Sequence, residues 1–236
     1  MQLNAPDNYR TATEIDMVAE LVDIRGARVL ELGCGDAWTT RGLVERLGAD
    51  EVIAAEVDRI QHDKNLAIDD LPQVRFVLGG AEAIDAPDAS FDAVFMFKSL
   101  HHVPESMMDR ALAEIHRVLK PGGKALFSEP VYWGDFNAVM SLIHDEQQVR
   151  QAAFNALCRA VDAGGFDSEA EVFIQVPGSY ATWDDFASRF LEVTHTALDV
   201  DAQRREQVRA AFEAHMTPTG AHFLKPHRID LLLKNG

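Results

Sequence analysis

The chain has 236 residues, 47% hydrophobic and 25% charged, a composition typical of a globular protein with one sizeable core. Its 22 Lys and Arg against 38 Asp and Glu give a net charge of −16, which argues against nucleic acid as a partner because the phosphate backbone is repelled. Two cysteines are too few for a disulfide framework, and no apolar run approaches the roughly 18 to 20 residues of a membrane span, so we expect a cytoplasmic protein without a membrane partner.

Apolar residues alternate between strand and helix spacing through the first half of the chain. A capping box at residues 11–14 predicts an opening helix that Gly26 ends. Helices are expected at 39–47 and 107–119, and strands at 29–32, 52–57, 74–78, 91–97 and 124–127. This order predicts a parallel sheet covered by helices.

The alternation fails after Glu129. Residues 136–163 form a long, mostly helical stretch that we interpret as an insertion over one sheet edge. The remaining elements are expected at 172–176 and 229–233 as strands and near 184–194 and 199–216 as helices.

No repeat or linker separates a second domain. We therefore expect one domain over 1–236. It would comprise an N-terminal helix (1–27), a cofactor-binding core (28–130) and a helical lid with the final strands (131–236).

A glycine-rich turn, Gly33-Cys34-Gly35, follows the first expected strand. Glycines there let a ligand approach the backbone, with amides pointing outward at a helix start. Glu56 ends the next strand about 20 positions later, the offset at which an acid binds ribose hydroxyls. Turn and acid together predict an adenosine site. Alternatively, the glycines only shape a tight connection and Glu56 is an exposed strand-end carboxylate.

Four segments resemble, in order, the motifs of class I S-adenosylmethionine-dependent methyltransferases, especially those that act on small molecules: VLELGCGDA, VIAAEVD, ASFDAVFMFKSLHHV and IHRVLKPGGKALFSEP. The resemblance covers roughly residues 28 to 130. It implies a doubly wound, Rossmann-like α/β fold with a seven-stranded, mostly parallel sheet, an antiparallel last strand and a helical insertion after the fifth strand. It also implies S-adenosyl-L-methionine as the cofactor, bound across the carboxyl ends of the first, second and fourth strands, where a topological switch point places a ligand.

The resemblance also implies roles for individual residues. Glu31 is expected to meet the methionine amino end and Glu56 the ribose. Phe97 and Lys98 would pass under the cofactor by their backbones, and His102 would pack against it. The full set expected to bind the cofactor is Tyr9, Glu31, Gly33, Cys34, Gly35, Glu56, Val57, Gly80, Ala81, Glu82, Phe97, Lys98 and His102.

Two positions depart from the family pattern. Gly80 stands where relatives commonly have an acid that binds the adenine amino group, so Glu82 or a backbone carbonyl would replace it. Ala37 stands where a third glycine is usual, and its methyl group is tolerated if the backbone stays at negative φ.

Two adjacent histidines, His101 and His102, follow the fourth strand. His101 is the candidate catalytic residue, because an imidazole with a pKa near 6.5 can take a proton from a hydroxyl or ammonium acceptor. Alternatively, both histidines only pack in the loop. A metal site of His101, His102 and Glu105 lacks the usual helical spacing and any thiolate, so no metal is expected.

Side chains after the fifth strand are expected to wall the acceptor pocket, and Tyr132 and Trp133 are the candidates for substrate binding. A basic cluster follows near the end of the chain: His222, Lys225, His227 and Arg228. It would either bind a carboxylate or phosphate of the acceptor or form a solvated face.

The sequence therefore predicts methyl transfer from S-adenosylmethionine to a small-molecule acceptor, at oxygen or nitrogen, by a monomer or homodimer. One alternative is a non-catalytic protein that binds the cofactor. A nicotinamide-dependent oxidoreductase fits less well, because its third fingerprint glycine would fall at Trp38.

Overall fold

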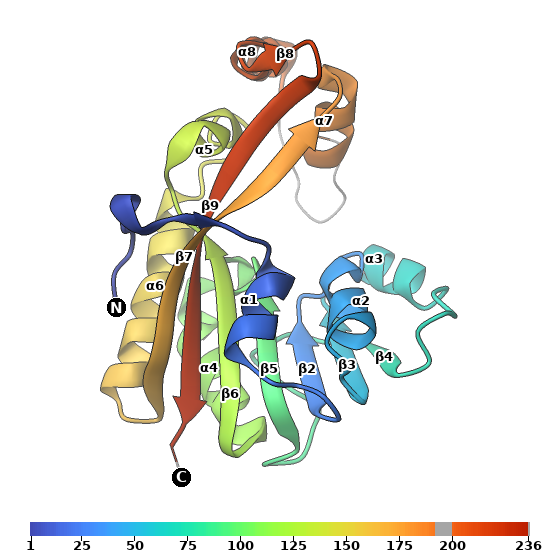
Figure 1. Cartoon of the computed structure of the whole chain (residues 1–236), viewed down its shortest axis with the longest axis vertical. Helices are drawn as coiled ribbons and strands as arrows, with labels where there is room; N and C mark the ends of the chain where they lie inside the picture. Colours follow the sequence, from blue (N-terminus) through green and yellow to red (C-terminus); the bar gives the residue numbers. More distant parts are fainter. Residues whose placement is uncertain (192–199, 236) are drawn as a thin grey trace.

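The computed structural model describes residues 1–191 and 200–235 (Figure 1). Its helices are α1 (Glu14–Leu21), α2 (Trp38–Glu45), α3 (Arg59–Asn65), α4 (Met108–Val118), α5 (Gly134–Met140), α6 (Gln147–Asp162), α7 (Trp183–Phe190) and α8 (Ala202–Glu213), with short 3-10 helices η1 (Pro6–Asn8), η2 (Leu100–His102) and η3 (Glu105–Met107). Its strands are β1 (Arg10–Thr11), β2 (Arg28–Leu32), β3 (Glu51–Glu56), β4 (Val74–Leu78), β5 (Phe91–Phe97), β6 (Leu119–Pro130), β7 (Phe166–Tyr180), β8 (Met216–Thr217) and β9 (Gly220–Lys234). Among the described helices, none combines the length and apolar character needed to cross a membrane.

The described strands form one sheet in the order β1-β7-β9-β6-β5-β2-β3-β4, with β8 beside β9. Strands β2 to β6 pair in parallel, as helical crossovers require. The last strand, β9, is antiparallel to both β6 and β7. The predicted Rossmann-like α/β class and antiparallel last strand are confirmed. The two-residue strands β1 and β8 extend the seven strands expected from the sequence.

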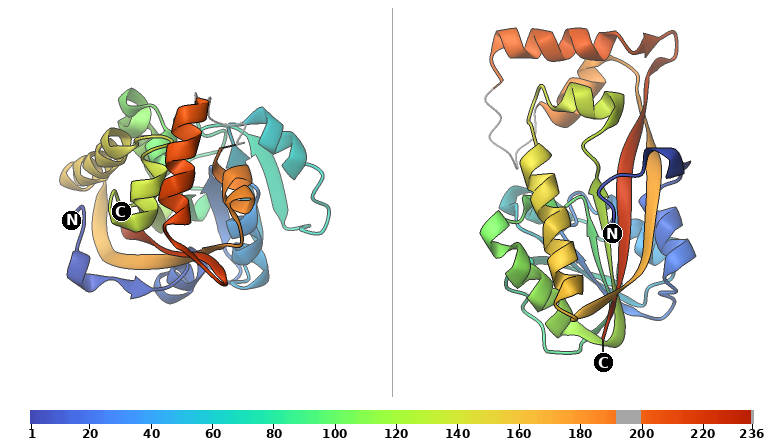
Figure 2. Two further views of the ribbon diagram at one scale, coloured as in Figure 1. Left: turned by 90° about the horizontal axis from the view of Figure 1, so that it is seen from above. Right: turned by 90° about the vertical axis from the view of Figure 1, so that its left-hand side faces the viewer.

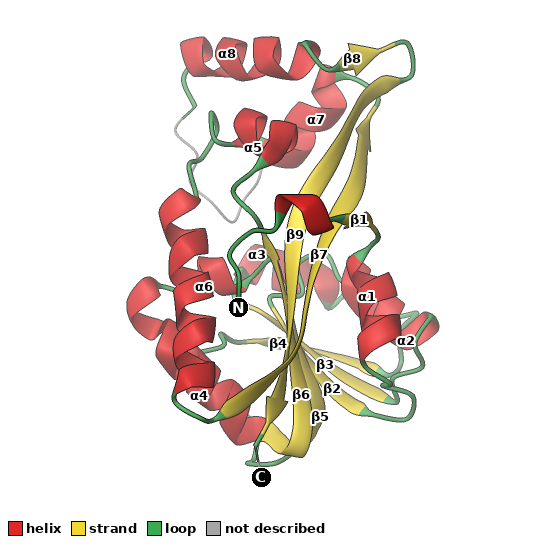
Figure 3. Ribbon diagram, turned by 60° about the vertical axis from the view of Figure 1, so that its left-hand side comes forward, coloured by secondary structure: helices red, strands yellow, loops and turns green. Residues whose placement is uncertain are grey.

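Helices cover both faces of the sheet (Figure 3). On one face, α4 and α6 bring Ile115 and Leu157 against Phe127 of β6. On the other, α1 and α2 bring Val18 and Leu43 against Phe95 of β5. The predicted edge insertion is therefore wrong for α6, whose apolar side packs beside α4 as an integral part of one layer.

The opening helix begins two residues later than its predicted capping box. Thr13 is the N-cap, and its side chain accepts from the Asp16 backbone N–H while the Asp16 carboxylate accepts from the Thr13 N–H. Thr11 belongs to β1 and pairs with Gln175 of β7, so residues 11–14 cannot form the box.

Strands β7 and β9 are longer than predicted. Each has 15 residues, about 50 Å at roughly 3.3 Å per residue. Their pairing continues from Phe166 opposite Lys234 to Tyr180 opposite Ala221, so the two strands leave the sheet as an arm (Figure 2).

The far end of this arm carries α5, α7 and α8, which together with the arm we call the cap. Tyr180, Phe186, Phe212 and Phe223 form its buried aromatic core. Figure 1 shows the cap beyond the carboxyl ends of the parallel strands. The predicted helices near 184–194 and 199–216 correspond to α7 and α8, and their residues 192–199 lie outside the described residues.

The turn into α2 contains a non-glycine residue in the left-handed region. Ala37 is the N-cap of α2 and has φ +64°, so the condition under which its methyl group would be tolerated, a negative φ, is not met. Placing a Cβ in this region costs roughly 1 to 2 kcal/mol because it approaches the following carbonyl oxygen.

Ala37→Gly should therefore stabilise the protein by about 0.5 to 1 kcal/mol, since glycine adopts this backbone without that clash. Ala113→Gly, in the exposed interior of α4, should instead destabilise by about 1 kcal/mol. Urea unfolding of both variants measures the difference. Equal destabilisation would contradict the assigned strain.

Candidate active site at the carboxyl ends of the strands

The turn after β2 is fixed from beneath by β3. The N–H groups of Gly33 and Cys34 donate to the Ala55 carbonyl at 2.9 and 3.0 Å, so these amides point inward, contrary to the prediction. Gly33 has φ +76°, and a Cβ there would stand 2.6 Å from the Ser99 Cβ. Glycine is therefore required where this turn passes the loop after β5. Gly35, at φ +53°, has no atom within 4 Å of its added Cβ, which leaves that side of the turn open.

The carboxylate of Glu56 joins the end of β3 to this turn. One oxygen accepts from the Gly35 N–H at 2.8 Å, and the other accepts from the N–H groups of Val57 and Asp58 at 2.8 and 2.9 Å. Beside them, the side chains of Val57 and Trp38 are exposed to 67% and 78%. The predicted turn and acid thus lie together, next to apolar surface that an adenine ring would cover. These residues fit an adenosyl group.

The segment after β4 lies at the same edge. The Gly79 N–H donates to the Glu56 carbonyl at 3.0 Å, and Ala81 is buried. A Cβ on Gly80 would stand 2.5 and 2.7 Å from the Glu82 carboxylate oxygens. The acid of Glu82 therefore occupies the space next to Gly80 in which an acidic side chain of residue 80 would begin.

Hydrogen bonds continue along this edge from β2 to β5. The Ser99 hydroxyl donates to the Leu32 carbonyl at 2.7 Å, and the Lys98 N–H donates to the Ser128 carbonyl at 2.7 Å. Lys98 has φ +56°, a second non-glycine residue in the left-handed region at this edge. Its ammonium group pairs with Glu14 of α1 at 2.6 Å. Phe97 is buried below.

Burial on its own would raise the pKa of Glu14, but the positive charges of Lys98 and His227 and the hydrogen bond from Lys98 lower it to about 2. This ion pair ties α1 to the loop after β5.

A buried histidine and a buried glutamate meet where β5 and β6 end. Glu129, 3% exposed, accepts from the N–H groups of Ser99 and Leu100 at 3.2 and 2.9 Å with one oxygen. Its other oxygen is hydrogen-bonded to Nδ1 of His101, which is 4% exposed. Burial favours a raised pKa for Glu129, yet His101 and the backbone donors lower it. The glutamate therefore stays ionised and fixes the imidazole ring.

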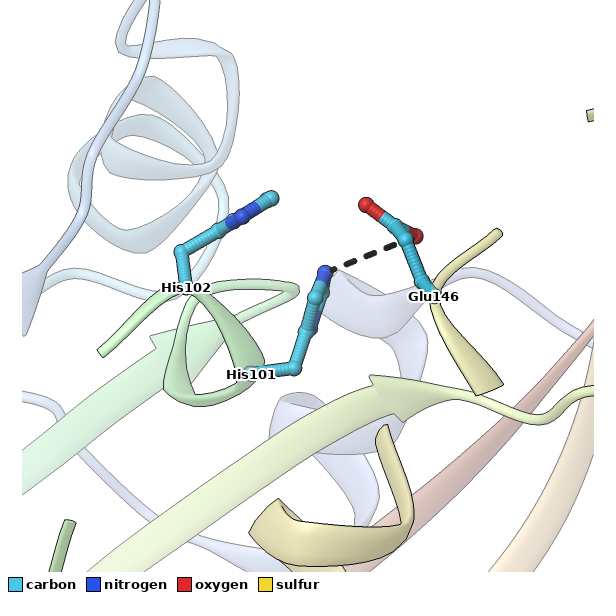
Figure 4. A group of neighbouring side chains, drawn as sticks. All are labelled: His101, His102 and Glu146. Atoms are coloured by element: carbon cyan, nitrogen blue, oxygen red, sulfur yellow. Dashed lines mark ion pairs between the residues drawn. The ribbon is translucent and has the colours of Figure 1, made fainter. Parts of the chain in front are cut away.

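The other ring nitrogen of His101 faces a second carboxylate. Nε2 lies 3.9 Å from Oε2 of Glu146 (Figure 4), and Arg150 holds the same oxygen at 2.6 Å. Although burial raises the pKa of Glu146, His101 and Arg150 lower it. In its neutral form, with Nδ1–H donated to Glu129, the ring has a lone pair at Nε2. The space between this lone pair and the carboxylate favours a proton or another positive charge.

Three groups here could also bind a metal ion. Ligand atoms of His101, His102 and Glu146 lie within 4.8 Å of one another, and Figure 4 shows the three side chains converging. The set contains Glu146 in place of the Glu105 considered from the sequence, because α6 brings Glu146 over η2. Arg150 already neutralises Glu146, and we assign no metal to this group.

The aromatic residues gather on the β9 side of this edge. The ring of Tyr9 lies 5.2 Å from that of Trp133 and 5.5 Å from that of Phe173, and its hydroxyl donates to Asn4 at 2.7 Å. Burial raises the pKa of Tyr9 to about 12. The structure thus brings Tyr9 together with the predicted substrate residue Trp133.

Glu31 is fully buried beneath the glycine turn. Its two oxygens accept from the hydroxyls of Thr39 and Thr40 on α2, so in this conformation the expected contact with the methionine amino end is closed. Burial raises the pKa of Glu31 to about 7, although both hydroxyls lower it. A nearby cation would favour its ionised form.

Because the folded state holds this proton more tightly than the unfolded chain, Glu31 should lower stability as the pH rises from about 4.5 to about 7. Glu31→Gln removes this effect, so the variant should gain up to about 3 kcal/mol relative to the wild type across that window. Urea unfolding at pH 5 to 8 measures this gain, with the exposed Glu45→Gln as the control. A difference that stays constant with pH would refute the assigned pKa.

Sequence reasoning missed Glu129, Glu146 and Arg150. Glu129 stands at the end of a strand motif, and the pairing of Phe97 with Ser128 places it opposite the loop after β5. That position could have identified it. Glu146 and Arg150 lie in a segment without a motif, so only the packing of α6 reveals them.

Comparison with known proteins agrees with this geometry. Residues 29–123 match a family model described as a methyltransferase domain. The phthiotriol/phenolphthiotriol dimycocerosates methyltransferase 1 of Mycobacterium ulcerans is 33% identical over 51% of this chain and 41% of its own length. The ubiquinone/menaquinone biosynthesis C-methyltransferase UbiE of Legionella pneumophila is 34% identical over 49% of each chain. This chain spans less than half the length of these two relatives.

Solved structures resemble nearly the whole chain. The YcgJ protein of Bacillus subtilis has a TM-score of 0.64 at 18% identity, covering 94% of this chain and 98% of its own. An S-adenosylmethionine-dependent methyltransferase of Mesorhizobium loti has a TM-score of 0.54 at 16% identity, covering 93% and 96%. The fold is shared over both chains, while the sequence match falls on the motifs around the glycine turn. Residues 29–123 therefore form a methyltransferase domain, and its motifs and sheet order resemble those of class I S-adenosylmethionine-dependent methyltransferases.

Proposed function

We propose that this protein transfers the methyl group of S-adenosylmethionine to an oxygen or nitrogen of a small molecule. The observation that carries the proposal is the buried His101–Glu129 pair, which adjoins the glycine turn through Ser99. When bound, the cofactor supplies an activated methyl group. The protein then has to position the acceptor, exclude water and remove a proton where the acceptor carries one.

The cofactor residues proposed at this edge are those assigned by the family motifs. Glu56 would accept from ribose hydroxyls, and its three backbone donors hold it in place. Glu82 would serve the adenine in place of an acid at residue 80. Glu31 would act on the methionine ammonium through its charge or after its threonine partners move.

His101 would take the proton of the acceptor at Nε2. Glu129 fixes the ring and stabilises the positive charge that the ring gains, as a carboxylate does for a histidine base. Glu146 faces the same nitrogen and would stabilise that charge further. The cap stands beyond this edge (Figure 1) and would exclude water. The positive charge gained at His101 is thus flanked by two carboxylates.

The name of one relative, a C-methyltransferase, makes carbon the alternative acceptor atom. The His101–Glu129 pair supplies a base for any acceptor that loses a proton as it is methylated, and we propose oxygen or nitrogen because a hydroxyl or ammonium group gives up its proton to an imidazole more readily than a C–H group does. Product analysis separates the two.

Glu56→Ala should weaken S-adenosylhomocysteine binding at least about tenfold, because it removes both the ribose acceptor and the bond to Gly35. Calorimetry measures the affinity. The control is Glu51→Ala at the other end of β3, where the carboxylate pairs with Arg28 at the surface. An unchanged affinity in Glu56→Ala would show that the ribose assignment is wrong.

His101→Gln should lower kcat about 10² to 10⁴-fold, the usual contribution of a general base. The affinity for S-adenosylhomocysteine should stay unchanged. Transfer of a labelled methyl group to an acceptor found by screening measures the rate. His116→Gln is the control, because His116 packs against Phe166 at the α4 face and should retain full activity.

If His101→Gln kept the wild-type rate at every pH, His101 would not be the base. Tight cofactor binding without methyl transfer to any acceptor in a broad screen would instead favour the non-catalytic alternative.

A further inference from the structure

A cavity of about 160 Å³ adjoins the His101–Glu129 pair. It lies between the N-terminal segment, the end of β6, the middle of β9 and the first turns of α6. Its lining includes Asn4, Glu129, Tyr132, Arg150 and Arg228. At roughly 30 Å³ for each water-sized group, the cavity has room for a carboxylate with a short chain attached.

Arg228 is buried at this cavity with much of its hydrogen-bonding capacity unused. Its side chain is 3% exposed, and its Nε–H donates to Asp230 at 2.6 Å. Its guanidinium lies 4.4 Å from the centre of the Phe154 ring. Within residues 1–191 and 200–235, no acceptor is found for its Nη1 and Nη2 groups. Because Arg228 lines the cavity, these groups are available to donate to an acceptor bound there.

The basic cluster expected from the sequence is divided by the strand. Side chains alternate between faces along β9, and His222 bonds to Ser179 on the exposed arm. His227 is buried on the face of α1, where burial and nearby Lys98 and Lys225 lower its pKa to about 4 although Glu14 raises it. Arg228 alone of this cluster lines the cavity, so the cluster is neither one site nor a solvated face.

The other charges at the cavity favour a singly charged, planar ligand. The oxygens of Glu129 are directed to Ser99, Leu100 and His101, so they leave Arg228 available. Glu129 and Asp230 nevertheless remain close enough to oppose a dianion. The forked guanidinium matches the two oxygens of a carboxylate.

We propose that this cavity binds the carboxylate of a small acceptor and that Arg228 is its bidentate partner. The acceptor would then be a short carboxylic acid with a hydroxyl or amine. Its role as the acceptor rests on the proposed function, because Glu129 both lines the cavity and holds the proposed base. Binding of a carboxylate in the cavity does not depend on methyl transfer.

Calorimetry on the full chain, saturated with S-adenosylhomocysteine, tests this with propionate and its neutral isostere propionamide. Arg228→Met alone would leave Asp230 buried without its partner, so the test variant is the double substitution Arg228→Met with Asp230→Asn. Asp230→Asn alone keeps the guanidinium and serves as the matched control. Arg189→Met, at an exposed pair on α7, controls for loss of a surface charge.

The wild type and Arg189→Met should bind propionate with similar affinity, and Asp230→Asn should bind it at least as tightly because it removes a negative charge beside Arg228. The double variant should bind it at least about tenfold more weakly, and the wild type should prefer propionate over propionamide by a similar factor. Equal propionate affinity in the wild type and the double variant would overturn the proposal. Tighter, Arg228-dependent binding of inorganic phosphate would overturn the carboxylate assignment.

Propionate binding and methyl transfer, measured on the same samples together with the affinity for S-adenosylhomocysteine, separate the two proposals. A wild type that binds propionate through Arg228 without methylating any acid would retain the site and refute its role in the reaction. Methylation of neutral acceptors only, without propionate binding, would refute the site and retain the proposed function.

Discussion

The candidate active site depends on one kind of interaction. A carboxylate at the end of one strand accepts from backbone N–H groups in the loop that follows the neighbouring strand. Glu56 at the end of β3 holds Gly35 after β2, and Glu129 at the end of β6 holds Ser99 and Leu100 after β5. The Ser99 hydroxyl joins the two halves by donating to Leu32. Four loops that are distant in sequence are thereby fixed to one another, because the parallel strands end at the same edge.

This arrangement places negative charge where a cationic donor would bind. Glu31, Glu56, Glu129 and Glu146 all lie at or beneath the edge, in a chain with a net charge of −16. Each is held by hydroxyl, amide, imidazole or guanidinium donors, which offset the cost of burial. A sulfonium donor suits such surroundings, and burial raises the pKa of Glu31.

Much of the fold could be predicted from sequence because its signals are local. The strand limits at 74–78 and 91–97 are confirmed residue by residue, and Gly33 and Glu56 were paired by a spacing contained within one motif series. The arm could not be predicted, because Pro177, Gly178 and Pro226 argue against a continuous strand. Pairing along the partner strand overrides that local signal.

The remaining gaps in the predicted site arise from contacts that no local pattern contains. Glu129 acquires its role from the register of β6 against β5, and Glu146 from the packing of α6. The positive φ of Ala37 is set by the turn as a whole, so its residue type could not reveal it. Arg228 was grouped with its sequence neighbours, although alternation along a strand separates them onto two faces.

A crystal structure with bound S-adenosylhomocysteine tests the account most directly. The account predicts the adenosyl group across Gly35 and Glu56, with the sulfur directed toward His101 and the cavity beside Arg228. A ligand bound elsewhere, or one whose sulfur points away from His101, would contradict it.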